Sequence, residues 1–304
     1  MPATGPACGP GATTCENTMR TLLTLLAVGL VAGGLRADDG PVAIKIKQPG
    51  VGDTIKESRT ERANNNITIS IMGQNQAQAE KVEAKFVYTD EILERPAGAK
   101  QPTKVKRTYE TAEMQGGPPG ELGLAGKTVL IEKGSDGYKF SVDGKPVNTR
   151  AAELLGKEFS KNKQVGEEDF VPKDPVKVGG TWKIDVDKIA KEAGDELDVD
   201  AAKSSATGKL VKVYDKGGHK FGQIEVTMEL ALKKVGPAGR QIELKPGAKL
   251  AIRATLDMCI DGSTWAVAGK MTTTGKFAGS AMGADVTFDL NSVRDGDGAE
   301  VGKK

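Results

Sequence analysis

The chain has 304 residues, of which 38% are hydrophobic and 4% aromatic. This composition supplies enough aliphatic core material for one large domain or two smaller ones. The 43 basic and 41 acidic residues nearly balance, so the charge offers no electrostatic case for a protein that binds nucleic acid or an anionic membrane surface.

The N-terminal region has the layout of a secretory signal peptide. Arg20 precedes an apolar run at 22–32, and small residues follow it. This order predicts a true start at Met19 and cleavage after Ala37, and the run is short for a membrane-spanning helix. Residues 1–37 are therefore interpreted as an upstream extension plus signal peptide. We expect a mature chain without a transmembrane helix, exported to the periplasm or the extracellular space.

Cysteine usage agrees with a fold that needs no disulfide. Cleavage would remove Cys8 and Cys15 and leave Cys259 alone. A single cysteine cannot form an intramolecular disulfide, so in an oxidising compartment the core alone must stabilise the fold. Cys259 falls on the polar side of its strand pattern, without a neighbouring base or positive charge. We therefore predict an unreactive thiol.

Alternation of apolar and polar residues dominates the chain after residue 37 and predicts half-buried strands. The clearest runs are 67–71, 82–88, 224–232, 250–260 and 286–290. The pattern predicts an all-β fold of mainly antiparallel meanders and hairpins, with a few short helices. Long C-terminal strands of this kind suit a strongly curved sheet or half-barrel.

Helical pattern is confined to 150–160 and 185–193, which contain no breaker before their ends. The expected organisation is a first β half at 38–160, a connection with a short helix at 161–203, a second β half at 204–293 and a tail at 294–304. The tail is rich in glycine and aspartate, and we expect it to be disordered. Whether the halves form one sheet system or two domains is left open.

Two turn signals predict hairpin registers. If Asp261 and Gly262 form a two-residue loop, Met258 lies opposite Trp265 and both strands direct their apolar residues to one face. A second hairpin is predicted to turn at 134–135.

The stretch 120–128, GELGLAGKT, invites comparison with a phosphate-binding loop. Such a loop needs four residues between its two glycines, whereas five separate Gly120 from Gly126. The stretch also leads into a predicted strand, not into the helix whose N-terminus would face a phosphate. We therefore interpret it as a connection between strands.

No catalytic, cofactor-binding or metal-binding residue is assigned from the sequence. His219 is the only histidine; it lies in a predicted hairpin loop, and no G-x-S-x-G motif accompanies it. The acidic clusters 195–200 and 295–298 lack the pattern of an EF-hand loop and are interpreted as solvated. The sequon 66–68 begins a strand pattern and is given no role.

One segment carries a family resemblance. Residues 170–182 match a P-x-x-P-V-K-x-G-x-x-W pattern at Pro172, Pro175, Val176, Lys177, Gly179 and Trp182. The segment resembles exported, planctomycete-type bacterial β-rich proteins of unknown function, and Gly180 replaces the acidic residue expected there. The resemblance implies no catalytic residue. Physically, Pro175 stiffens the chain, Gly179 and Gly180 permit a tight turn, and Trp182 anchors the next strand.

These observations favour a non-enzymatic, exported β protein that binds a ligand or partner at the cell envelope. A curved sheet lined by Leu, Ile and Met suits a lipid or another apolar molecule. One alternative is a carboxylate-based hydrolase, which requires acidic residues from separate strands to converge in a concave site. The other is a structural component of the envelope.

Overall fold

The computed structural model describes residues 40–117, 120–159, 165–193, 197–236, 240–281 and 283–303. The predicted leader, with Met19 and Ala37, lies outside these residues, as do Cys8 and Cys15. Within the described ranges, no helix combines the length and apolar character needed to cross a bilayer.

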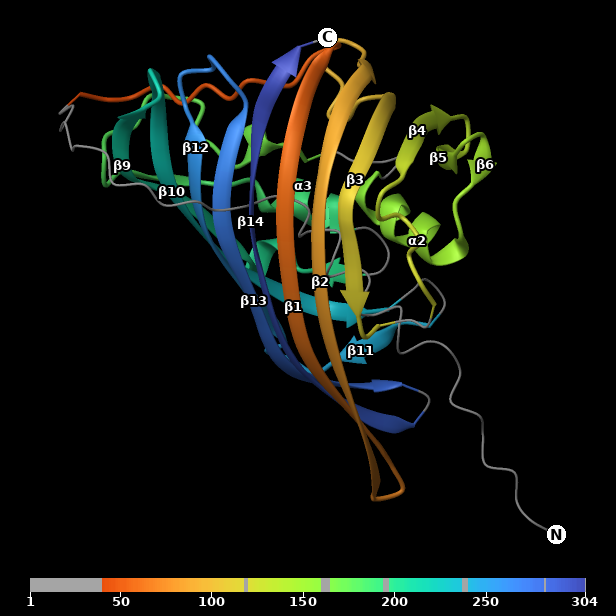
Figure 1. Cartoon of the computed structure of the whole chain (residues 1–304). Helices are drawn as coiled ribbons and strands as arrows, with labels where there is room; N and C mark the ends of the chain where they lie inside the picture. Colours follow the sequence, from red (N-terminus) through yellow and green to blue (C-terminus); the bar gives the residue numbers. More distant parts are fainter. Residues whose placement is uncertain are drawn as a thin grey trace.

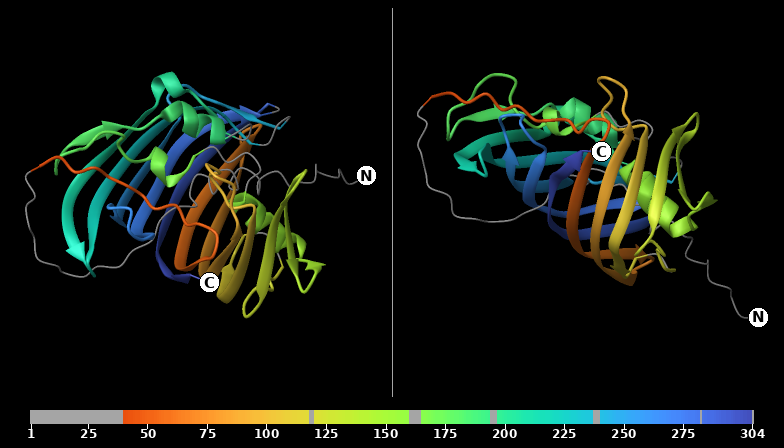
Figure 2. Two further views of the ribbon diagram at one scale, coloured as in Figure 1. Left: turned by 90° about the horizontal axis from the view of Figure 1, so that it is seen from above. Right: turned by 45° about the horizontal axis from the view of Figure 1, so that its top comes forward.

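One antiparallel sheet of fourteen strands dominates the described part of the chain and bends so that one face is concave (Figures 1 and 2). The strands are β1 Asp53–Ile71, β2 Gln74–Glu94, β3 Lys104–Gln115, β4 Thr128–Gly134, β5 Gly137–Val142, β6 Lys145–Pro146, β7 Thr181–Lys183, β8 Leu197–Val199, β9 Ser205–Lys216, β10 His219–Val235, β11 Ile242–Leu244, β12 Lys249–Cys259, β13 Ala266–Ala281 and β14 Ala284–Lys303. Their order is β6-β5-β4-β3-β2-β1-β14-β13-β11-β10-β9-β7; β12 also pairs with β10 and β13, and β8 with β10. The predicted antiparallel, mainly β fold is confirmed.

The first and last long strands lie side by side in the middle of this sheet (Figure 1). β1 and β14 pair from Asp53 opposite Lys303 to Ser70 opposite Asp285. Residues 294–303, for which the sequence predicted disorder, are therefore the end of β14, which pairs with β1 and, up to Ala299, also with β13. Both predicted β halves contribute strands to the same sheet.

Glycines in this last stretch allow neighbouring groups to pack closely against the strand. The prediction of disorder was based on composition and did not take this packing into account. A Cβ added at Gly296 would lie 2.0 Å from the Ser58 carbonyl oxygen, and one at Gly298 would lie 2.8 Å from the Trp265 ring. Both approaches are closer than a side chain tolerates, so glycine is required for the neighbouring strand and ring to pack there.

Both predicted helices are present; three of their four ends are shifted by one or two residues, and the end at Ala193 is as predicted. α2 spans Thr149–Glu158, and its preceding Asn148 accepts a hydrogen bond from the Ala151 amide at 2.9 Å. α3 spans Val186–Ala193 and buries Ile189 in the core. Helix α2 packs beside β4–β6, whereas α3 lies nearer the sheet centre on the concave side (Figure 2).

The two predicted hairpins exist, but each register is displaced by two residues. Met258 lies opposite Val267 instead of Trp265, because residues 260–265 form a longer connection than a two-residue loop. In the hairpin of β4 and β5, Gly134 pairs with Gly137, so the turn falls one residue later than predicted. A displacement of two keeps every side chain on its predicted face, since the side-chain period of a strand is two.

Two apolar clusters stabilise the concave side. The larger one joins β8–β14 to α3, with the opposed pair Leu230 and Leu250 fully buried. The smaller one joins β2–β5 to α2 around Phe86 and Leu155. Between them, on the inner faces of β1, β2, β3 and β14, charged side chains replace apolar ones.

Trp182 has the anchoring role that the sequence predicted. Its ring covers Gly208 of β9, where an added Cβ would lie only 2.2 Å from the ring. Its indole N–H donates to the Phe170 carbonyl oxygen at 2.9 Å. The half-buried ring thus joins β7 to β9 and to the preceding segment.

Candidate functional site

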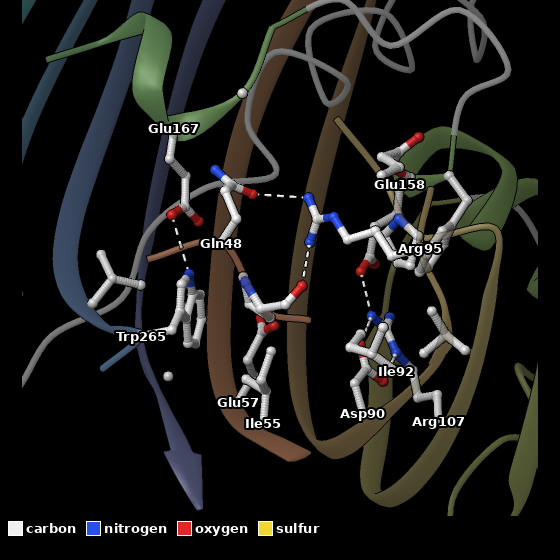
Figure 3. Close-up of a pocket in the computed structure, with 18 of the residues that line it drawn as sticks. Gln48, Ile55, Glu57, Asp90, Ile92, Arg95, Arg107, Glu158, Glu167 and Trp265 are labelled. Atoms are coloured by element: carbon white, nitrogen blue, oxygen red, sulfur yellow. Dashed lines mark hydrogen bonds and ion pairs between the residues drawn. The ribbon is translucent and has the colours of Figure 1, made fainter. Parts of the chain in front are cut away.

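A cavity of about 170 Å³ lies where the two apolar clusters leave room for charged residues (Figure 3). We call it the charged pocket. Its lining includes Glu57, Arg59, Asp90, Arg107 and Glu158. They come from three neighbouring strands and from the last turn of α2, so the curvature of the sheet and the docking of α2 together create the site.

Arg107 lies at the centre of the charged pocket. Its Nε and Nη2 atoms donate to the two carboxylate oxygens of Asp90 at 2.7 Å, and Nη2 also donates to Glu158 at 2.6 Å. Its guanidinium lies 3.8 Å from the centre of the Tyr88 ring. Burial opposes the charge, but Asp90 and Glu158 more than compensate and raise the pKa of Arg107 well above its usual value. The cluster therefore contains a permanent buried cation.

Glu57 is the titratable group of this cluster. It accepts a hydrogen bond from the Tyr88 hydroxyl at 2.8 Å. Burial, and then repulsion by Asp90 and Glu158, raise the pKa of Glu57 to about 7 in spite of the nearby Arg107. Glu57 can therefore exchange a proton near neutral pH, whereas Asp90 and Glu158 are bound to Arg107.

Two further arginines lie on the inner face with incomplete hydrogen bonding. Arg59 on β1 has Nη1 3.7 Å from a Glu158 oxygen, and Arg294 on β14 donates from Nη2 to Glu61 at 2.8 Å. Within the described part of the chain, Arg59 Nε and Arg294 Nε and Nη1 are buried without an acceptor. Buried donors of this kind are uncommon in folded proteins.

A second, smaller cavity of about 50 Å³ adjoins the charged pocket. We call it the apolar pocket; its wall is formed by β10, β12 and β13, with Met228, Leu256 and Met271 among its lining residues. Glu167 and Val267 line both cavities. The concave face therefore offers one hollow with an apolar part and a charged part.

A covering segment crosses the junction of the two pockets. We call residues 165–171 the strap; it contains the short 3-10 helix Glu167–Asp169 and places Phe170 and Val171 against the apolar pocket. The Trp265 indole N–H donates to Glu167 at 3.1 Å (Figure 3).

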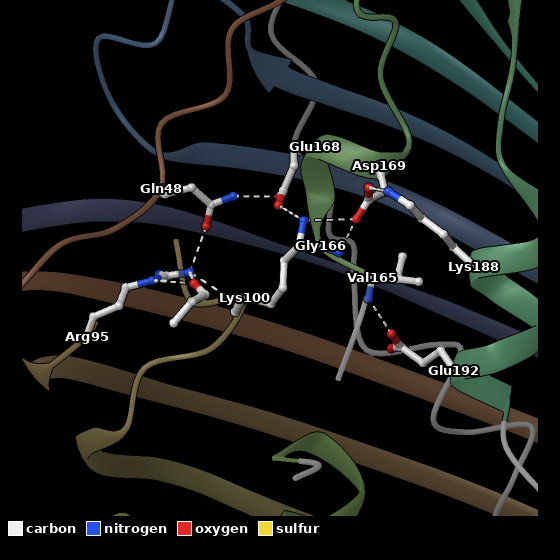
Figure 4. A network of polar contacts seen from close by, with 10 residues as sticks. Gln48, Arg95, Lys100, Val165, Gly166, Glu168, Asp169, Lys188 and Glu192 are labelled. Atoms are coloured by element: carbon white, nitrogen blue, oxygen red, sulfur yellow. Dashed lines mark hydrogen bonds and ion pairs between the residues drawn. The ribbon is translucent and has the colours of Figure 1, made fainter. Parts of the chain in front are cut away.

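Polar side chains hold the rest of the strap in place (Figure 4). Glu168 accepts from Lys100 and from Gln48, the latter at 2.8 Å. Asp169 accepts from Lys100 at 3.1 Å and from Lys188 of α3 at 2.8 Å. The strap is therefore attached by side chains of three separate regions, without belonging to a strand of the sheet.

The structure brings His219 and Cys259 into one small cluster that the sequence did not reveal. His219 Nδ1 lies 2.6 Å from Ser263 Oγ, and Cys259 Sγ donates to Asp261 at 3.1 Å. The Lys220 amide and Ser263, followed by Cys259, donate to Asp261 and lower its pKa well below the usual range. None of these residues lines either pocket. The cluster organises the connection between β12 and β13.

The other sequence candidates lie away from the site. Gly120 to Lys127 form the connection before β4, as predicted, and residues 66–68 lie within β1. Part of the 195–200 cluster lies outside the described residues, and Asp200 pairs with Lys203 at 3.3 Å. Among the described residues, no group of three His, Cys, Asp or Glu side chains is arranged to hold a metal ion.

No protein-family model and no curated protein matches this chain. Four chains of solved structures match, among them a DUF1329 family protein from Desulfovibrio piger. That match has 10% sequence identity, covers 92% of this chain and 91% of the other, and has a TM-score of 0.12. Such a value says nothing about function. The resemblance to exported planctomycete-type proteins stays a prediction.

Proposed function

We propose that this protein is an exported binding protein that holds an amphiphilic molecule on the concave face of its sheet. The apolar part of the ligand occupies the apolar pocket, and its polar part reaches the charged pocket. The observation that carries this proposal is the junction of the two cavities at Glu167 and Val267. Export, to the periplasm or beyond the cell, rests on the predicted leader at 1–37.

The apolar wall supports the apolar part of the proposal. Met228, Leu256 and Met271 come from three neighbouring strands and face the same hollow. The cavity of about 50 Å³ is small because Phe170 and Val171 of the strap occupy the wall. Both strap side chains are only half-buried, so an alkyl chain that replaces them regains a similar apolar contact. Ligand entry therefore requires movement of the strap.

The strap can move without disrupting the sheet, because its attachments are side-chain contacts. Its polar anchors, Lys100, Gln48 and Lys188, are partly exposed, and contacts of this kind exchange readily with water.

Binding of dodecanoate to the purified chain without residues 1–37 tests the proposal. We expect saturable 1:1 binding by calorimetry, and amphiphilic molecules in the mass spectrum of an extract of the purified protein. Met228→Trp fills the apolar pocket and should abolish binding, whereas Thr227→Trp, on the exposed face of the same strand, should not. Thermal unfolding of both variants controls for misfolding. Absence of binding in the wild type, or unchanged binding in a folded Met228→Trp variant, would contradict the proposal.

A second candidate is the carboxylate-based hydrolase. The specific observation in its favour is that Glu57, Asp90 and Glu158 converge from two strands and a helix, with the pKa of Glu57 at about 7. Against it, both other carboxylates are bound to Arg107. Hydrolysis of chromogenic glycosides that disappears in Glu57→Gln would establish this candidate. Equal rates in the wild type and in this variant would dismiss it.

A further inference from the structure

Arg59 and Arg294 are neighbours on the inner face of adjacent strands. Arg59 lies opposite Gly296, and Glu61 lies opposite Arg294 in the pairing of β1 and β14. The two arginines are therefore diagonal neighbours, a spacing that long side chains bridge. Burial, partly offset by Glu61 and reinforced by the positive charge of Arg59, lowers the pKa of Arg294. Burial also opposes the charge of Arg59, but Tyr88, Glu158 and Glu61 outweigh it and raise the pKa of Arg59. The structure thus holds two buried cations side by side, with Glu61 and Glu158 as acidic neighbours.

The hydrogen bonds of this pair are incomplete, in contrast to those of Arg107. Arg107 has carboxylate acceptors on Asp90 and Glu158. Among the described residues, Arg59 forms an ion pair with Glu158 at 3.7 Å and lies 4.9 Å from the centre of the Phe86 ring, and Arg294 forms an ion pair with Glu61 at 2.8 Å. Their three open donor atoms are buried, and each desolvated donor without an acceptor is costly. An anionic oxygen group placed between the two side chains would remove this cost.

The position of the pair connects it to the apolar pocket. On the neighbouring strand β13, Met271 lies directly opposite Arg294, and Met271 lines the apolar pocket. Gly296 of β14 lies opposite Arg59, and Gly269 of β13 lies opposite Gly296. Neither glycine carries a side chain that would separate Arg59 from the apolar wall. An alkyl chain laid along this wall would therefore end beside Arg59, which lines the charged pocket, with Arg294 as its diagonal neighbour.

We propose that Arg59 and Arg294 bind the anionic head group, a carboxylate or a phosphate, of the amphiphile that the concave face holds. This inference rests on the proposed function and adds the charge of the ligand to it. The two arginines then select for charge: an uncharged molecule with the same chain gains the apolar contact but leaves the open arginine donors without an acceptor.

Competition with an uncharged probe tests this assignment. The full chain without residues 1–37 is loaded with N-phenyl-1-naphthylamine, a neutral fluorescent apolar compound, and titrated with dodecanoate or dodecanol. We expect dodecanoate to displace the probe at a concentration at least about tenfold lower than dodecanol, because only the carboxylate offers the arginines charged oxygen acceptors. Arg59→Met should bring the two concentrations close together by weakening only dodecanoate.

Control variants separate charge recognition from folding. Arg62→Met removes an arginine from the exposed face of the same strand and should leave both titrations unchanged. Arg294→Met alone would leave Glu61 buried without its partner, so the pair Glu61→Gln/Arg294→Met is used, with thermal unfolding as a check. It should lose the preference for dodecanoate in the same way as Arg59→Met.

The outcomes distinguish the two proposals. If dodecanoate and dodecanol displace the probe equally well from the wild type, the head-group assignment is overturned while the apolar site stands. If neither displaces it nor binds directly, the proposed function itself fails. If inorganic phosphate or acetate at the same concentration competes with dodecanoate as strongly as an amphiphile does, the arginines serve a free anion and the head-group assignment is overturned.

Discussion

Arg107 and Asp90 form a bidentate ion pair on the inner face of neighbouring strands, with both hydrogen bonds at 2.7 Å. Their side chains are 2% and 9% exposed. In a pair this deeply buried, the attraction between the two charges offsets the free-energy cost of removing them from water, and loss of one partner leaves the other charge buried and uncompensated. It therefore links the two strands more strongly than an exposed ion pair would.

Removal of one partner should be severe. We expect Asp90→Ala to lower the free energy of unfolding by about 3–5 kcal/mol, because it leaves the buried Arg107 charge with less compensation. Because Glu158 also accepts from Arg107, replacement of all three members in Asp90→Leu/Arg107→Met/Glu158→Gln should cost much less. Asp289→Ala, which breaks the exposed pair with Lys276, should cost about 1 kcal/mol or less. Urea unfolding measures all three, and a single Asp90 variant as stable as the wild type would contradict the buried pair.

The raised pKa of Glu57 makes stability depend on pH. The folded protein holds the Glu57 proton up to pH of about 7, whereas the unfolded chain loses it near the ordinary glutamate value. Folding is therefore penalised progressively as the pH rises through this window, and the penalty is complete above it. Glu57→Gln removes the penalty and still accepts the Tyr88 hydrogen bond. We expect it to stabilise the protein by about 3 kcal/mol at pH 8 and to have little effect at pH 4.

Thermal unfolding at several pH values checks this expectation. The control is Glu225→Gln, an exposed glutamate on the outer face of β10, which should change stability little at any pH. A stabilisation by Glu57→Gln that grows toward low pH would have the opposite pH dependence and would contradict a raised pKa of Glu57.

The pairing of β1 with β14 makes residues 295–303 structural. Deletion of residues 295–304 removes eight of the eighteen residue pairs between β14 and β1. It also removes the Glu300 carboxylate, which accepts from Lys47 and from the Trp265 amide. We expect the deletion to lower the melting temperature by more than 10 °C or to prevent folding, because the middle of the sheet is opened. A disordered tail would make the deletion neutral, so differential scanning fluorimetry decides between the two descriptions. Deletion of residue 304 alone is the control.

Strands in which apolar and polar residues alternate could be predicted from the sequence. Strand segments with polar residues on both faces could not. In β10 and β12, buried residues alternate with exposed ones, so their existence and the orientation of their faces were predictable. At the start of β1 and the end of β14, charged or small residues point to both sides. No periodicity distinguishes such a strand from a loop, and the glycines of β14 were therefore interpreted as flexibility.

The candidate site could not be predicted from the sequence, for a related reason. Its carboxylates and arginines lie on β1, β2, β3, β14 and α2, and only the sheet order places β14 beside β1. Glu57, Arg59 and Glu61 occupy every second position. In a strand this spacing places three charges on one face, which is a signal that the sequence does contain. The outer face of that strand is equally polar, so the sequence alone gives no reason to place these charges inside.

Asp169 connects the strap to both sides of the hollow. It accepts from Lys100, from Lys188 of α3 and from the Gly166 amide within the strap. Asp169→Ala removes all three contacts, and we expect backbone amide hydrogen exchange across 165–171 to accelerate by about tenfold or more, since opening of a local segment sets its exchange rate. Asp174→Ala, an exposed aspartate shortly after the strap, is the matched control. If the strap guards the apolar pocket, the same variant should also bind and release dodecanoate faster in stopped-flow measurements, while Asp174→Ala retains the wild-type rates. Faster amide exchange without faster ligand exchange would show that the strap moves but does not limit entry.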